Sequence, residues 1–175
     1  MKFTYSSRVY IIAVFAALAS LLQLLEIFII LPIPFIKIGL ANSITLYFLK
    51  KREYVTAFFI NIIRIFVGGF FSAKLFSLPF LFSLSGGIIS FSVMYFLIVV
   101  FRDKISIAMV SVMSAVAFNL TQYFLFSKIF GTGMEYDTTV SIIMLLSIPA
   151  GIITAIVVNG LLKLNVDIVI DNKFN

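Results

Sequence analysis

Apolar runs of about 20 residues recur along this chain, and that repetition constrains the fold more than any other feature. An α-helix of that length crosses the ~30 Å hydrocarbon core of a lipid bilayer. Hydrophobic residues make up 62% of the 175-residue chain and charged residues 11%. Soluble domains are typically about 45–50% apolar and about 25% charged. The sequence therefore predicts an all-α, polytopic integral membrane protein with a single transmembrane domain over residues 1–175.

Prolines, glycines and basic clusters divide the apolar sequence into six predicted transmembrane helices. Pro32 and Pro34 end the first helix, because proline removes a backbone donor and disfavours helix just before it. The second helix is too short to span the bilayer upright, so its flanks or its neighbours must shield it. Pro79 indicates a bent entry to the fourth helix. The expected helices are 9–31, 38–49, 54–71, 75–100, 105–126 and 140–162, followed by a polar tail at 165–175.

The distribution of lysine and arginine predicts the orientation, since cytoplasmic loops of membrane proteins carry an excess of both. We place the N-terminus in the cytoplasm and count six spans. Nine basic residues then lie inside and three lie outside. Both termini are therefore expected in the cytoplasm. The inner set is Lys2, Arg8, Lys50, Lys51, Arg52, Arg102, Lys104, Lys163 and Lys173, and the outer set is Lys37, Lys74 and Lys128.

Two charges of opposite sign, Glu26 and Arg64, lie inside apolar runs. An unpaired charge near the middle of a membrane helix costs at least ~2.5–3.5 kcal/mol. With a rise of about 1.5 Å per residue, both residues fall roughly 7–10 Å below the outer ends of their helices. We expect them to face the interior of the bundle or a wet cavity. Whether they contact each other or a ligand is left open by the sequence.

Five amides share the outer half of the bundle with these two charges. Gln23 is one turn from Glu26, and Asn61 is one turn from Arg64. Hydrocarbon offers polar groups no partners, so their common depth predicts a shared cavity open to the outside. Hydrogen bonds between helices, each worth ~1 kcal/mol or less, are the alternative explanation. The predicted substrate-binding residues are Gln23, Glu26, Asn42, Asn61, Arg64, Asn119 and Gln122.

Several classes of function are disfavoured by what the chain lacks. It has no cysteine and no histidine, which removes disulfides, thiol chemistry and the commonest general base. It has no glycine-rich phosphate-binding loop and no cluster of paired carboxylates. Its basic residues are spread between the apolar runs, which does not favour nucleic-acid binding. We therefore expect no catalytic residues, no cofactor and no metal site.

Small residues four positions apart mark the first predicted helix. Ala13 and Ala17 form one such pair, and Ala16 and Ser20 form another. This spacing allows another helix to approach closely. The partner helix belongs either to the same bundle or to a separate docked protein.

Two glycine pairs, Gly68-Gly69 and Gly86-Gly87, have two interpretations. They either admit a ligand close to the backbone or mark tight helix crossings. The 21 phenylalanines are assigned to lipid-facing surface or to core packing rather than to an aromatic binding box.

Several stretches resemble a bacterial membrane family known as heptaprenyl diphosphate synthase component I, or Gx transporter. The segment IKIGLANSITL at 36–46 resembles its IKLGLANIVTL signature. Arg64 followed by Gly68-Gly69 resembles its R…GG segment. FLFSLSGG at 80–87 resembles its FLLSLAGG, and SAVAFNLTQ at 114–122 resembles its GAVAHNLGQ.

The resemblance covers about residues 13–160, with one departure. Phe118 occupies the position where the family usually has histidine. This substitution speaks against a proton-linked role at that position.

The family is similar in layout to the S-components of energy-coupling-factor (ECF) transporters. That likeness implies a six-helix, S-component-like bundle with an outward pocket for a small molecule. It also implies that Ala13 and Ala17 dock a transmembrane coupling subunit, with partner ATPases supplying the energy. The location would be the bacterial cytoplasmic membrane, with the chain crossing it several times.

The family label carries an alternative. In that version the chain is a non-catalytic membrane partner of a prenyl diphosphate synthase catalytic subunit, or of a quinone-linked redox complex. It would present a lipidic substrate or anchor the soluble enzyme.

Overall fold

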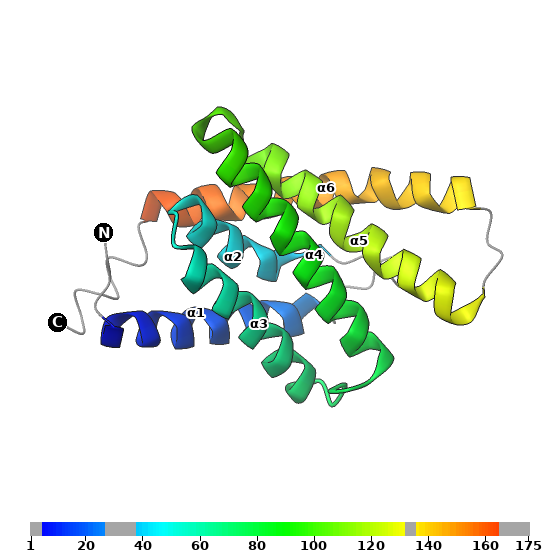
Figure 1. Cartoon of the computed structure of the whole chain (residues 1–175), viewed down its shortest axis with the longest axis horizontal. Coiled ribbons are helices and arrows are strands. Elements are labelled where there is room, and N and C mark those ends of the chain that lie inside the picture. The colour runs from blue at the N-terminus through cyan, green and yellow to red at the C-terminus, as the bar shows by residue number, and fades with distance from the viewer. Residues whose placement is uncertain (1–4, 27–37, 132–135, 165–175) are drawn as a thin grey trace.

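The structure, a computed structural model, describes residues 5–26, 38–131 and 136–164 (Figure 1). These ranges contain six α-helices and no strand, which confirms the predicted all-α class. A short 3-10 turn, η2, connects α4 to α5. The elements are α1 (Tyr5–Leu25), α2 (Leu40–Lys50), α3 (Tyr54–Phe71), α4 (Leu78–Phe101), η2 (Arg102–Lys104), α5 (Ile107–Phe130) and α6 (Tyr136–Leu164).

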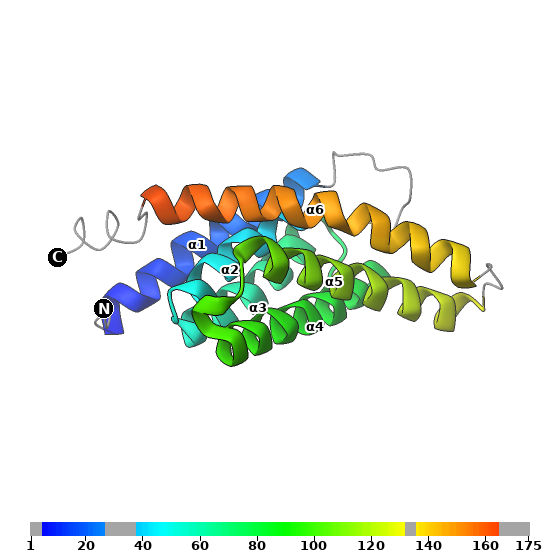
Figure 2. The ribbon, with the colours of Figure 1, turned by 90° about the horizontal axis from the view of Figure 1, so that it is seen from above.

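Five of the six helices are long and apolar enough to cross a membrane. The exception is α2, which has 11 residues and so rises about 16 Å, roughly half of the hydrocarbon thickness. Residues 41–49 of α2 are all buried. It packs against α1, α3, α4 and α6, and Figure 2 shows it in the middle of the bundle. The protein itself thus shields the short helix, one of the two solutions that the sequence left open.

Aromatic side chains form the core around α2. The Phe15 ring meets the Phe48 ring edge-on, with centroids 4.8 Å apart. The rings of Tyr47 and Phe48 make a second edge contact at 5.1 Å. All three side chains are almost completely buried, and such ring pairs add about 0.5–1.5 kcal/mol beyond the area that they bury. The core therefore fixes α2 against α1.

Helix termini differ from the predicted ones where capping residues decide them. Pro79 does not mark a bend. It lies in the first turn of α4, where its missing N–H costs nothing. Ser106 accepts a hydrogen bond from the backbone N–H of Met109 (3.1 Å) and starts α5. Gly131, with φ 59°, ends α5 at Phe130, four residues beyond the expected end. The predicted end of the first helix at residue 31 lies outside the described residues.

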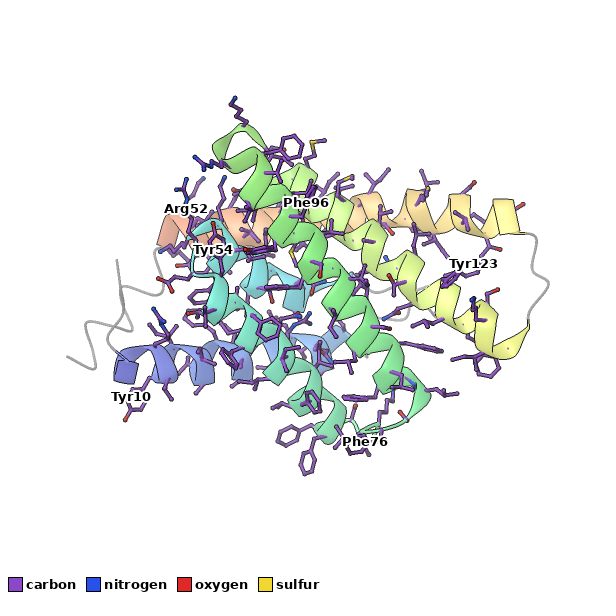
Figure 3. All side chains as sticks on the ribbon, viewed as in Figure 1. Tyr10, Arg52, Tyr54, Phe76, Phe96 and Tyr123 are labelled. Carbon is purple, nitrogen blue, oxygen red and sulfur yellow. The ribbon has the colours of Figure 1, made fainter. Side chains whose placement is uncertain are left out.

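Consecutive helices run in opposite directions, so basic residues from distant segments gather at one end of the bundle (Figure 1). An ion pair of 3.8 Å joins Arg8 near the start of α1 to Glu53 in the α2–α3 turn. In Figure 3, Arg52 and Phe76 mark the two ends of α3. We call the end of the bundle marked by Arg52 the basic end. It carries Arg8, Lys50, Lys51, Arg52, Arg102, Lys104 and Lys163.

The two small-residue pairs of α1 have different surroundings. Ala16 and Ser20 are buried, and the Ser20 hydroxyl donates to the Ala16 carbonyl (2.7 Å). Ala13 and Ala17 are exposed on the outer face of α1. Packing within the bundle therefore accounts for Ala16 and Ser20, whereas Ala13 and Ala17 face outward and are available for another interaction.

Candidate functional site: a buried arginine beside a cavity

Arg64 on α3 is the centre of a hydrogen-bonded cluster of amides. Its side chain is 4% exposed. Nε and Nη2 donate to Oδ1 of Asn61, at 3.2 Å and 2.8 Å. Nη2 also donates to Oδ1 of Asn42 on α2, and Nη1 donates to Oε1 of Gln23 on α1 at 3.3 Å. We call Gln23, Asn42, Asn61 and Arg64 the arginine cluster.

The cluster ties together the first four helices. Asn61 precedes Arg64 by three residues, so both side chains lie on one face of α3. The Asn61 amide donates in turn to the carbonyl of Gly87 on α4 (3.2 Å). Inside a low-dielectric interior, such a network is strong when it is satisfied and costly when it is broken. The cluster therefore has a structural role whatever else it does.

Glu26 directly follows α1, and its carboxylate lies beside the arginine cluster at the N-terminus of α2. Its Oε1 accepts from the backbone N–H of Ala41, at 3.4 Å. Free N–H groups and the positive end of the dipole make a helix N-terminus a favourable place for a carboxylate. Gly39 supplies the left-handed turn that starts α2, with φ 80°. Glu26 also interacts electrostatically with Arg64, so the two intramembrane charges share one region, as the sequence predicted.

A cavity of about 470 Å³ opens next to this region, where α1, α3 and α5 end and α4 begins. Its size falls within the range of about 300–1,000 Å³ that is typical of small-molecule sites. It lies at the end of the bundle opposite the basic end. Its polar lining consists of Gln23, Glu26, Ser72, Lys74, Ser83 and Gln122.

A smaller recess of about 10 Å³ adjoins the cavity. Arg64 and Asn42 line the recess but not the cavity. Gln23, Glu26, Ile65 and Ser83 line both spaces. These four residues therefore lie between the cavity and the recess, and Gln23 accepts a hydrogen bond from the guanidinium of Arg64 there.

The structure distributes the seven predicted site residues over three positions. Gln23, Glu26 and Gln122 line the cavity, and the Gln122 amide also donates to the carbonyl of Phe82 (3.4 Å). Asn42, Asn61 and Arg64 form the layer behind them. The set thus consists of a cavity wall, a supporting layer and one residue that lies elsewhere.

Asn119 is that separate residue. Its amide donates to the hydroxyl of Ser147 on α6 (2.9 Å), and it lines neither space. Its position corresponds to the hydrogen bond between helices that the sequence analysis kept as the alternative. A ligand contact at Asn119 stays a prediction.

Sequence reasoning missed the aromatic part of the wall. The sequence predicts lipid-facing or core positions for the phenylalanines, yet Phe80, Phe82, Phe126 and Phe130 line the cavity. A signal was present on α5, because Gln122, Phe126 and Phe130 follow at intervals of four and share one helix face. The ring centroids of Phe126 and Phe130 lie 4.6 Å apart.

The glycine pairs mark close packing. A Cβ at Gly68 would lie 2.6 Å from Nε2 of Gln23, and one at Gly69 would lie 2.8 Å from the ring of Phe80. On α4, a Cβ at Gly86 would lie 3.1 Å from the ring of Phe118, and one at Gly87 would lie 2.6 Å from Ile65. The tight-crossing interpretation therefore holds for both pairs, although Gly68 and Gly69 also line the cavity.

Substitution of Gly68 by alanine should displace the Gln23 side chain and break its hydrogen bond to Arg64. One lost hydrogen bond to a charged group costs about 1.5–3 kcal/mol, but the flexible glutamine reorients, so we expect the lower part of that range. Unfolding of purified protein by increasing SDS, followed by circular dichroism, measures the change. Stability equal to wild type would contradict the contact.

The described fold and cavity define a class: an α-helical, multi-pass membrane protein with a polar group of side chains between its helices. The sequence model of heptaprenyl diphosphate synthase component I matches residues 15–161, and the chain belongs to that family. This confirms the resemblance drawn from residues 13–160. Comparison with curated proteins and with solved structures found no match.

Proposed function

We propose that this protein is a non-catalytic membrane subunit that binds a small molecule in the 470 Å³ cavity. The observation that carries the proposal is a cavity of ligand size with both polar and aromatic walls, at the end opposite the basic end. Under the positive-inside rule the basic end faces the cytoplasm, with both termini, and the cavity faces the outside of a bacterial cell.

Uptake of the bound molecule is the first form of this proposal. Ala13 and Ala17 are exposed on α1, together with Val14 and Leu21. Exposed small residues on a membrane helix allow a second helix to approach closely. In this form α1 docks an ECF-type transmembrane coupling subunit, and its partner ATPases drive transport.

Association with a prenyl diphosphate synthase is the second form, and the family description favours it. Here the chain is the membrane component, and the catalytic subunit is a separate soluble protein. The basic end, with Arg52, Arg102 and Lys104, would dock an acidic face of that enzyme or anionic lipid. A quinone-linked redox complex would use the same end.

Affinity purification from gently solubilised membranes separates the two forms. Co-purified ATPases and a coupling subunit support uptake, whereas a prenyl synthase or a redox subunit supports the second form. Substitution of both Ala13 and Ala17 by leucine should release the coupling subunit in the first case and release nothing in the second.

The cavity itself is tested by filling it. Ser83→Phe places a ring in the wall of the cavity, and Ser92→Phe places the same ring on the exposed face of the same helix. We expect native mass spectrometry to show at least about a tenfold loss of retained small molecule in the first variant, since one lost contact of 1.4 kcal/mol already costs tenfold. The second variant should behave like wild type. Equal retention by both variants would contradict ligand binding in this cavity.

A further inference from the structure

Gln23 occupies the position between the guanidinium of Arg64 and the cavity. Its side chain lines both the cavity and the recess behind it, and its Oε1 accepts from Nη1 of Arg64 at 3.3 Å. Asn42 and Asn61, the other two acceptors, are 5% and 1% exposed and are held deep between helices. Gln23 is only half-buried. Of the three amides, Gln23 is therefore the one that a molecule entering the cavity would meet first.

The contact that Gln23 makes is also the easiest to replace. The hydrogen bond between Gln23 and Arg64 is 3.3 Å long, whereas Asn42 and Asn61 each make a shorter one, and its acceptor is a neutral amide. A carboxylate or phosphate oxygen adds Coulomb attraction to the cationic guanidinium and can accept two parallel N–H donors from it, neither of which the neutral amide of Gln23 provides. In a membrane interior the difference grows, because the local dielectric is low. Replacement of the Gln23 amide by an anionic oxygen on Arg64 is therefore favourable.

The charges around the cavity permit an anion there. Arg64 behind the wall and Lys74 in the wall are cations, and Glu26 is the anion that opposes them. Glu26 accepts from the N–H of Ala41 at 3.4 Å and also interacts with Arg64, so the two cations exceed the one anion around the cavity. The phenylalanines of the wall supply apolar contact for the rest of a ligand.

On the basis of the proposed binding function, we infer that the ligand is an amphipathic anion and that Gln23 is the residue it displaces. A carboxylate or phosphate group replaces Oε1 of Gln23 on Nη1 of Arg64, while an aromatic or otherwise apolar body lies against Phe82, Phe126 and Phe130. Gln23 satisfies the guanidinium while the cavity lacks a ligand. It also selects against neutral molecules, which gain too little to displace it.

The test uses two probes of nearly equal shape, 1-naphthaleneacetate and its neutral amide, 1-naphthaleneacetamide. Isothermal titration calorimetry on the purified full-length protein compares their affinities. We expect the acetate to bind at least about tenfold tighter, a factor that corresponds to about 1.4 kcal/mol. The same titration with 1-naphthyl phosphate asks whether phosphate serves as well as carboxylate.

Two variants of Gln23 carry opposite expectations. Gln23→Ala removes the competitor for Arg64 and should raise the affinity for both probes, because the carbonyl of the neutral amide then also meets an unpaired Nη1, while the acetate should remain the tighter ligand. Gln23→Glu is nearly isosteric and gives Arg64 an internal carboxylate, so it should abolish the preference for the acetate. If Gln23 were only a wall residue, both variants would weaken both probes together, and that result would overturn the inference.

The occupant is a free molecule rather than a phospholipid headgroup in this inference. Titrations in nanodiscs of phosphatidylglycerol and of phosphatidylcholine distinguish the two. Equal affinity for the acetate supports a free ligand, whereas marked competition by phosphatidylglycerol would overturn that part of the inference.

Failure of this inference is distinguishable from failure of the proposed function. Equal binding of the two naphthalene probes would overturn the anion preference while supporting the cavity as a binding site. Binding of neither probe to folded protein would also overturn the inference. Retention of a neutral small molecule in native mass spectrometry would then still support the proposed function, and its absence would count against both.

Discussion

Replacement of Arg64 by alanine is expected to lower the stability of the folded protein by about 2–5 kcal/mol. The guanidinium satisfies the amide oxygens of Asn42 and Asn61, which are almost fully buried. A buried acceptor that loses its partner costs about 1–3 kcal/mol, and two are orphaned here. The substitution also removes the cation that interacts with Glu26. Unfolding by increasing SDS, followed by circular dichroism, measures the loss.

Arg8→Ala provides the matched control for this measurement. Arg8 makes a long ion pair of 3.8 Å with Glu53, and the two side chains are 35% and 17% exposed. Ion pairs near the surface contribute about 0–1 kcal/mol, so the control should lose much less stability than Arg64→Ala. Equal losses for Arg8→Ala and Arg64→Ala would show that the arginine cluster does not hold the first four helices together.

Substitution of Gly151 by alanine is expected to separate α5 from α6 and to cost about 1–3 kcal/mol, the usual cost of overpacking. A Cβ at Gly151 would lie 2.5 Å from Cα and 2.8 Å from the backbone nitrogen of Val112. Backbone atoms cannot rotate away as a side chain can, so the whole helix must shift. The same SDS unfolding experiment reports the loss of stability.

Gly160→Ala is the control within the same helix. No heavy atom lies within 4 Å of a Cβ added at Gly160. Alanine is favoured over glycine in a helix interior by about 0.8–1.0 kcal/mol, so this variant should be unchanged or slightly more stable. Opposite signs for the two alanines are the expected result, and a loss of equal size would contradict the close crossing of α5 and α6.

Parts of the site were readable from sequence because they depend on depth along a helix. Glu26 and Arg64 lie at similar depths near the outer ends of α1 and α3, which run in the same direction, and the rise per residue is enough to place them together. Gln23 and Asn61 follow from the helical repeat, since each lies one turn from one of these charges. The same arithmetic fails for Asn119, because depth does not say which neighbour a helix face meets, and α5 turns Asn119 toward Ser147.

The cavity wall was harder to predict for a related reason. Lys74 lies in the α3–α4 connection, whose path depends on left-handed turns at Ala73 and Phe76. Phe80 and Phe82 lie in the first turns of α4, and nothing in the local sequence distinguishes them from lipid-facing phenylalanines. Their role follows from how α4 and α5 pack, which is a matter of tertiary contact.

The sequence alone determined that this chain crosses a membrane as helices, that one helix is too short to do so unaided, and that two charges and several amides share one depth. These properties follow from hydrophobicity, helix rise and the cost of polar groups in hydrocarbon, which act on each segment separately. Only the tertiary structure decided which partners the polar groups take. It placed Gln23 between Arg64 and the cavity, set Glu26 at the start of α2, and paired Asn119 with Ser147. The physical reason is that a hydrogen bond between helices depends on their rotation and crossing, which packing of the whole bundle sets.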